Sequence, residues 1–116
     1  MEKFLFVLTR GLEDPIRVTR ALQLAKIAKE KGHDVTVFFT DDAVMLCQEG
    51  LIEHVMAPSG DEAVAQFIYL LAHKTPFYVC KPCAEFRKIT NLVENATLAT
   101  GHKLIDLAVE SKVFTF

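Results

Sequence analysis

The sequence contains no tryptophan and only three cysteines, Cys47, Cys80 and Cys83. Three is an odd number and too few for the disulfide framework of a small secreted domain. No apolar stretch approaches the roughly 20 residues that span a membrane, and the run at residues 4–8 is too short for the core of a signal peptide. We therefore expect a cytoplasmic protein, in which a close pair of cysteines suggests redox, sulfur or metal chemistry.

An excess of positive charge is also missing. The 116 residues include 13 lysines and arginines against 15 aspartates and glutamates, which gives a formal net charge of -2. Domains that bind nucleic acid usually carry a basic stripe, so nucleic acid is not expected as the main partner. The glycine patterns that bind nucleotide phosphates are absent too, because residues 10–13 read Arg-Gly-Leu-Glu where such a loop would stand. No cofactor is expected.

Apolar residues, by contrast, make up 51% of the chain, and they fall in alternating strand-like and helix-like segments. The predicted strands are residues 3–9, 34–40, 51–57, 77–80 and 113–116. The predicted helices are residues 15–31, 43–48, 62–74, 84–91 and 101–110, with a polar connection at 95–100. This alternation predicts one α/β domain over residues 1–116, a three-layer sandwich with a mostly parallel five-stranded sheet and helices on both faces.

The predicted helix at residues 62–74 is apolar nearly all round, which is typical of a helix buried on more than one side. A domain of this size has few places to bury two helix faces. The sequence therefore favours an interface between subunits over burial within one subunit.

The strongest chemical signal is an apolar run that ends at Cys80 and is followed by Lys81, Pro82 and Cys83. Open α/β sheets bind ligands at the carboxyl ends of their strands, and the thiolate is the reactive form of cysteine. Backbone N–H groups at the start of the next helix, together with the cation of Lys81, predict that the pKa of one thiol is lowered by about one unit or more.

Three other interpretations of this cysteine pair stay open. A dithiol switch of the thioredoxin type is one, although that motif follows the first strand of its fold and not the fourth. A zinc site is another, but it needs four ligands, and neither a second C-x-x-C nor a spaced histidine pair is present, so no metal is expected. The third is a pair of inert small residues at a strand end.

Further polar residues follow the first two strands and are expected at the same edge of the sheet. Arg10 either is solvated or lines the pocket, where its charge would hold a thiolate or persulfide. Asp41 and Asp42 share this edge, and Asp14 is expected to cap the first long helix. Cys47 is expected to be a small core residue. The remaining candidates, expected at the surface or at helix ends, are His33, His54, His73 and His102.

Several short sequence patterns follow one another in a characteristic order along the chain. They are residues 11–15 (Gly-Leu-Glu-Asp-Pro), 32–35 (Gly-His-Asp-Val), 38–44 (Phe-Phe-Thr-Asp-Asp-Ala-Val), the cysteine ending the fourth predicted strand, and 107–114. In this order and spacing the chain resembles, over almost its whole length, the DsrE/DsrF-like sulfur-relay family, which includes the small sulfurtransferase subunits of the TusBCD type. The resemblance implies that Cys80 carries a persulfide, and that the subunit assembles into homo-oligomers, as trimers or hexamers, with active cysteines near subunit boundaries.

These observations together predict a sulfur carrier or sulfurtransferase that exchanges sulfur with donor and acceptor proteins. Cys80 would accept a sulfane sulfur, and Cys83 would assist its release by forming a disulfide with Cys80. Arg10 and Lys81 are the predicted substrate-binding residues. The alternatives are a thiol-disulfide redox protein or sensor that uses the same two cysteines, and a non-catalytic assembly subunit.

Overall fold

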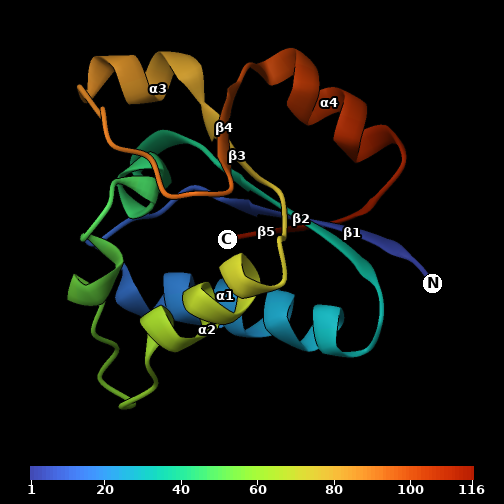
Figure 1. The fold of residues 1–116 in the computed structure, drawn as a ribbon, viewed down its shortest axis with the longest axis horizontal. Helices are drawn as coiled ribbons and strands as arrows, with labels where there is room; N and C mark the ends of the chain where they lie inside the picture. Colours follow the sequence, from blue (N-terminus) through green and yellow to red (C-terminus); the bar gives the residue numbers. More distant parts are fainter.

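The computed structural model describes residues 1–116, which form one five-stranded sheet covered by helices (Figure 1). In chain order the strands are β1 (Lys3–Leu8), β2 (Asp34–Phe39), β3 (Phe77–Cys80), β4 (Ala96–Ala99) and β5 (Lys112–Thr115). They lie side by side in the order β4-β3-β2-β1-β5, and every pairing is parallel. The predicted α/β class is confirmed, and the sheet is wholly rather than mostly parallel.

Two helices lie on each face of the sheet (Figure 1). On one face are α1 (Pro15–Glu30) and α2 (Ala63–Ala72), and on the other are α3 (Lys81–Phe86) and α4 (Gly101–Val109). Asp14 caps α1 as predicted, because its carboxylate accepts a hydrogen bond of 3.3 Å from the N–H of Arg17. None of the helices combines the length and the apolar character that crossing a membrane requires.

The prediction of a strand at residues 51–57 is wrong. The segment contains a short 3-10 helix, η2 (Ile52–His54), and Met56 forms only an isolated bridge with Glu62. The buried residues here are Ile52 and Val55. They are three positions apart, which puts them on one side of a helix with three residues per turn. Their spacing therefore belongs to a 3-10 turn and not to a strand.

The missing strand is β4, which falls in the segment predicted to be a polar connection. It pairs with β3 from the Phe77–Ala96 pair to the Cys80–Ala99 pair. Because β4 is an edge strand with Thr97 and Leu98 exposed, it lacks the continuous apolar run of a buried strand. Cys80 consequently ends the third strand of the chain, and not the fourth.

Two helices near the cysteines also differ from the prediction. The segment expected at residues 43–48 is a 3-10 helix, η1 (Asp41–Cys47). The helix expected at residues 84–91 is α3, which begins at Lys81 and ends at Phe86. Pro82 fits there because the first turn of a helix needs no N–H from it. The left-handed backbone of Lys88, with φ 57°, prevents α3 from continuing.

The main core lies between the sheet and the layer of α1 and α2. It contains 22 buried residues, and its aromatic members are Phe6, Phe39, Phe67 and Phe77. Cys47 belongs to this core with 0% exposure, as predicted, and burial raises its pKa well above the ordinary value.

The opposite face is covered less completely. Its buried cluster holds only Leu5, Val7 and Phe38, and α4 has no buried residue. On the other side of the sheet, Ile68 of α2 is 58% exposed, so α2 is not enclosed within this chain. Burial of α2 between subunits remains a prediction.

Candidate functional site

The site forms where β2 and β3 end next to each other. Phe39 pairs with Val79 in the sheet, so the next residues along the two strands, Thr40 and Cys80, emerge together at the carboxyl edge. The hydroxyl oxygen of Thr40 lies 3.8 Å from the sulfur of Cys83. Parallel pairing therefore brings a hydroxyl group to a pair of thiols that is distant in the sequence.

The two cysteines occupy the first turn of α3. Cys80 is the N-cap residue, and Cys83 is the third residue of the helix. The side chain of Cys80 makes no capping hydrogen bond with α3, and the two cysteines lie within one turn of the helix. Both thiols are free and half-buried.

Burial raises the pKa of the Cys80 thiol, and the neighbouring side chain of Cys83 raises it further. The N–H of Cys83 and the hydroxyl of Thr40 act in the opposite direction, because such donors favour the thiolate. The prediction that the helix start lowers the thiol pKa is therefore wrong for Cys80. The effect of burial outweighs that of these donors.

A hollow of about 470 Å³ opens beside Cys83. The other residues that line it are Asp41, Asp42, Pro82, Phe86 and Arg87. Cys80 does not line it. Of the two thiols, Cys83 is thus the one that lines the hollow.

An ion pair between Asp42 and Arg87 links η1 to α3 across this hollow. The same two residues line a second hollow of about 290 Å³, together with Leu12, Glu13 and Met45. Sequence reasoning did not identify Arg87. Its position four residues after Cys83 was the available signal, since residues four apart share a helix face.

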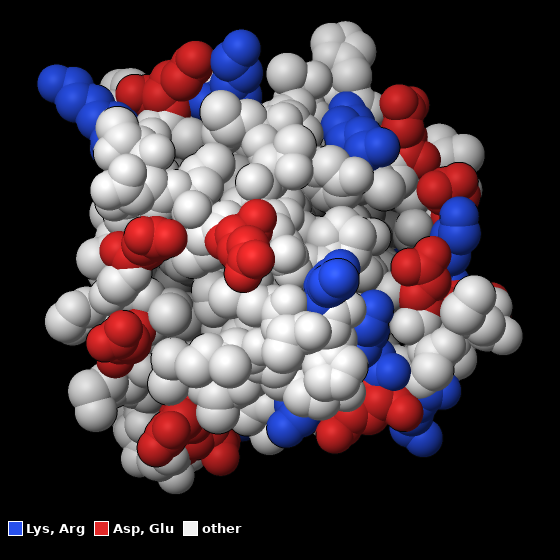
Figure 2. All heavy atoms as spheres, viewed as in Figure 1, with Lys and Arg blue, Asp and Glu red and all other residues white.

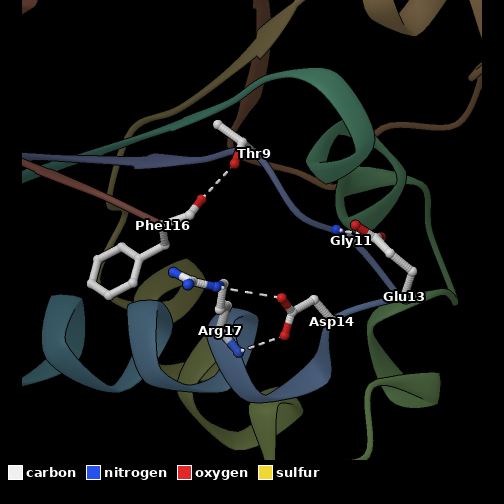
Figure 3. Close-up of polar contacts among 6 residues, drawn as sticks. All are labelled: Thr9, Gly11, Glu13, Asp14, Arg17 and Phe116. Atoms are coloured by element: carbon white, nitrogen blue, oxygen red, sulfur yellow. Dashed lines mark hydrogen bonds and ion pairs between the residues drawn. The ribbon is translucent and has the colours of Figure 1, made fainter.

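The loop after β1 borders the second hollow and is held by short polar contacts (Figure 3). The carboxylate of Glu13 accepts a 2.8 Å hydrogen bond from the N–H of Gly11, and the hydroxyl of Thr9 donates to the carbonyl of Phe116 at 2.7 Å. A Cβ atom on Gly11 would lie 2.5 Å from the carbonyl oxygen of Asp42. Glycine is thus required here for close approach of the loop to η1.

The two predicted substrate-binding residues lie outside both hollows. Arg10 and Lys81 are exposed, and the cation among the lining residues is Arg87. Their role in binding remains a prediction. His54, His73 and His102 are exposed as expected, and no three His, Cys, Asp or Glu side chains are grouped closely enough to hold a metal ion.

Known proteins share both the sequence pattern and the fold. The model of the DsrE/DsrF-like family matches residues 2–116. The YchN protein of E. coli has a similar structure, with a TM-score of 0.82 and 24% identity over 100% of both chains. The BT1422 protein of Bacteroides thetaiotaomicron gives 0.71 and 15%, over 99% of this chain and 95% of its own.

A more distant likeness reaches an archaeal protein. The MTH1491 protein of Methanobacterium thermoautotrophicum gives a TM-score of 0.69 at 11% identity, over 100% of both chains. At these identities the structural likenesses concern the fold alone. No curated protein sequence matches the chain.

Proposed function

Since the chain belongs to the DsrE/DsrF-like family, we propose that it is a cytoplasmic sulfur carrier or sulfurtransferase that holds sulfane sulfur as a persulfide on Cys80. One observation carries the proposal. The half-buried thiol of Cys80 ends β3 at the carboxyl edge of the sheet, within one helical turn of a second free thiol, Cys83, whose sulfur lies 3.8 Å from the hydroxyl oxygen of Thr40.

Loading begins when the Cys80 thiolate attacks the outer sulfur of a donor persulfide. A new S–S bond forms on Cys80, the S–S bond of the donor breaks, and the donor leaves as a thiolate. The N–H of Cys83 and the hydroxyl of Thr40 stabilise the attacking thiolate. Because burial raises the pKa of Cys80, loading becomes faster as the pH rises above neutrality.

Release has two routes. In the first, the thiolate of an acceptor protein attacks the outer sulfur and removes it. In the second, Cys83 attacks the inner sulfur of the persulfide, which forms a disulfide with Cys80 and expels hydrosulfide. A thiol reductant must then reduce this disulfide before the next cycle. The exposed cations of Arg10 and Lys81 would bind the substrate near this edge.

Assembly into a homo-oligomer belongs to the same proposal. Its support is apolar surface that the chain leaves open, namely Ile68 on α2 and Val109 on α4, of which Val109 is 82% exposed. Light scattering on the purified protein distinguishes a trimer from a hexamer. A monomer at micromolar concentration would contradict this part of the proposal.

A thiol-disulfide redox function is the second candidate. The observation that favours it is the presence of two free, half-buried thiols, Cys80 and Cys83, within one helical turn. Under this alternative, Cys83→Ser abolishes reduction of protein disulfides. Under the main proposal the same variant still gains sulfur on Cys80.

The deciding experiment is mass spectrometry of the intact protein after incubation with inorganic polysulfide. We expect the parent, Cys83→Ser and the core control Cys47→Ala to gain one sulfur atom that dithiothreitol removes. Cys80→Ser should not gain it. Equal sulfur gain by Cys80→Ser and the parent would exclude Cys80 as the carrier.

A further inference from the structure

The charges around the hollow beside Cys83 do not cancel. Asp42 is paired with Arg87, whereas the carboxylate of Asp41 makes no hydrogen bond or ion pair within the chain. Glu13, at the adjoining hollow, contacts only the N–H of Gly11. On the face that Figure 2 shows, charges of both signs are scattered without a large field of one sign. The local excess of carboxylate, and not the net charge of the protein, therefore decides which groups approach this thiol favourably.

The part of the lining that α3 contributes next to Cys83 is apolar. Phe86 is 85% exposed and lines the hollow together with Pro82 and Cys83. An aromatic side chain left this exposed beside a functional group is typical of a surface that contacts another protein. A donor of a few atoms would leave most of the Phe86 ring in water.

A small anionic donor fits the hollow poorly. The cation that lines it, Arg87, already pairs with Asp42, and Arg10 and Lys81 lie outside the lining. An anion that approaches Cys83 would therefore meet the unpaired carboxylate of Asp41. A cation at the same place would gain from it.

From this charge complementarity, and resting on the proposed function, we infer that the partner exchanging sulfur at this site is a protein whose reactive cysteine is flanked by basic side chains. Asp41 receives a basic side chain of the partner, and Phe86 receives the apolar part of the same segment. Asp41 and Phe86 thus select the partner, whereas Cys80 and Cys83 perform the exchange.

The test uses thiol exchange with short peptides and does not require persulfide formation. Three capped peptides carry cysteine flanked by two arginines, two glutamines or two glutamates, each as a mixed disulfide with thionitrobenzoate. The protein thiolate attacks the peptide sulfur, a protein–peptide disulfide forms, and thionitrobenzoate leaves because it is the more acidic thiol. Its absorbance gives the rate, which is divided by the rate of the same probe with N-acetylcysteine amide.

At low ionic strength we expect the arginine probe to react about fivefold or more faster than the glutamate probe after this correction. The preference should shrink in 0.5 M salt, at a Debye length of about 4 Å. Asp41→Asn should reduce it by about two- to fivefold, as expected for the loss of one charge at contact distance in water. Asp34→Asn is the matched control at the opposite edge of the sheet and should leave it unchanged.

A fourth probe, the mixed disulfide of cysteamine, tests whether a protein segment is required. Phe86→Ala should slow the arginine peptide and leave this small cation unaffected. Equal slowing of both would overturn the assignment to a protein partner. Equal rates for the arginine and glutamate probes, no reaction with any peptide, or equal effects of Asp41→Asn and Asp34→Asn would overturn the inference itself. If the charge preference is found but polysulfide never loads Cys80, the proposed function fails while the inference about the partner stands.

Discussion

The hydroxyl oxygen of Thr40 lies 3.8 Å from the sulfur of Cys83, although 43 residues separate the two in the sequence. The contact exists because β2 and β3 are neighbours and end at the same edge. The hydroxyl of Thr40 also lowers the pKa of Cys80, against the larger effect of burial. Thr40, which lies outside the C-x-x-C segment, thus favours the thiolate form of Cys80.

Replacing Thr40 by valine should slow the reactions of Cys80 at neutral pH. Valine keeps the shape of threonine but cannot donate to the thiolate, so the pKa of Cys80 should rise. Each unit of pKa corresponds to about a tenfold loss of thiolate. The rate of Cys80 alkylation by iodoacetamide, followed by peptide mass spectrometry from pH 6 to 10, gives the pKa directly. Thr36→Val, within β2, is the control and should leave the titration of Cys80 unchanged.

Replacing Cys83 by alanine should have the opposite effect. The side chain of Cys83 raises the pKa of Cys80, and alanine removes this thiol but keeps the backbone N–H, which lowers that pKa. The alkylation titration of Cys80 should therefore move to lower pH. A shift to higher pH in Cys83→Ala would show that the thiol contact stabilises the Cys80 thiolate instead.

The stability of the protein should fall at alkaline pH, in part because of Cys47. Its pKa in the folded protein is raised well above the ordinary value of 9.0, so the folded state favours the protonated thiol. This contribution to stability is complete below pH 9 and is lost as the pH rises towards the higher folded pKa. Urea unfolding from pH 7 to 10 should show a smaller alkaline loss in Cys47→Ala than in the parent. Parallel pH profiles would contradict the assignment.

Gly11→Ala should destabilise the protein by about 1–3 kcal/mol, the usual cost of overpacking. The new Cβ would lie 2.5 Å from the backbone oxygen of Asp42, and backbone atoms cannot move aside as a flexible side chain can. Gly101→Ala is the matched control, because nothing lies within 4 Å of its Cβ position at the start of α4. Urea unfolding should show Gly101→Ala to be neutral or stabilising. If Gly11→Ala and Gly101→Ala lost the same stability, the contact with the Asp42 oxygen would not be the cause of the loss.

Some of the fold could be predicted because its signals are local. The buried strands β1, β2 and β3 are rich in apolar residues, and Asp14 caps α1 as its position before Pro15 indicates. The edge strand β4 could not be recognised, because only its pairing with β3 makes it a strand. Residues 51–57 do not form the predicted strand, because the buried residues Ile52 and Val55 are spaced as in a 3-10 turn.

The candidate site, like the fold, could be predicted only where its signal is local in the sequence. A cysteine at the end of an apolar run is visible in the sequence, and Cys80 is placed accordingly. Its contact with Thr40 depends on the strand order, which no local pattern contains. The direction of the pKa shift of Cys80 depends on its burial, which only the tertiary fold decides.

The wholly parallel sheet also affects how the chain folds during synthesis. No two strands form a hairpin, so every pairing closes a long loop, and sheets of this kind assemble slowly. Cys80 is synthesised before β4, the strand that covers its outer side. Both thiols of the pair are therefore synthesised before their folded surroundings exist, and in that interval the fold does not shield them from oxidation.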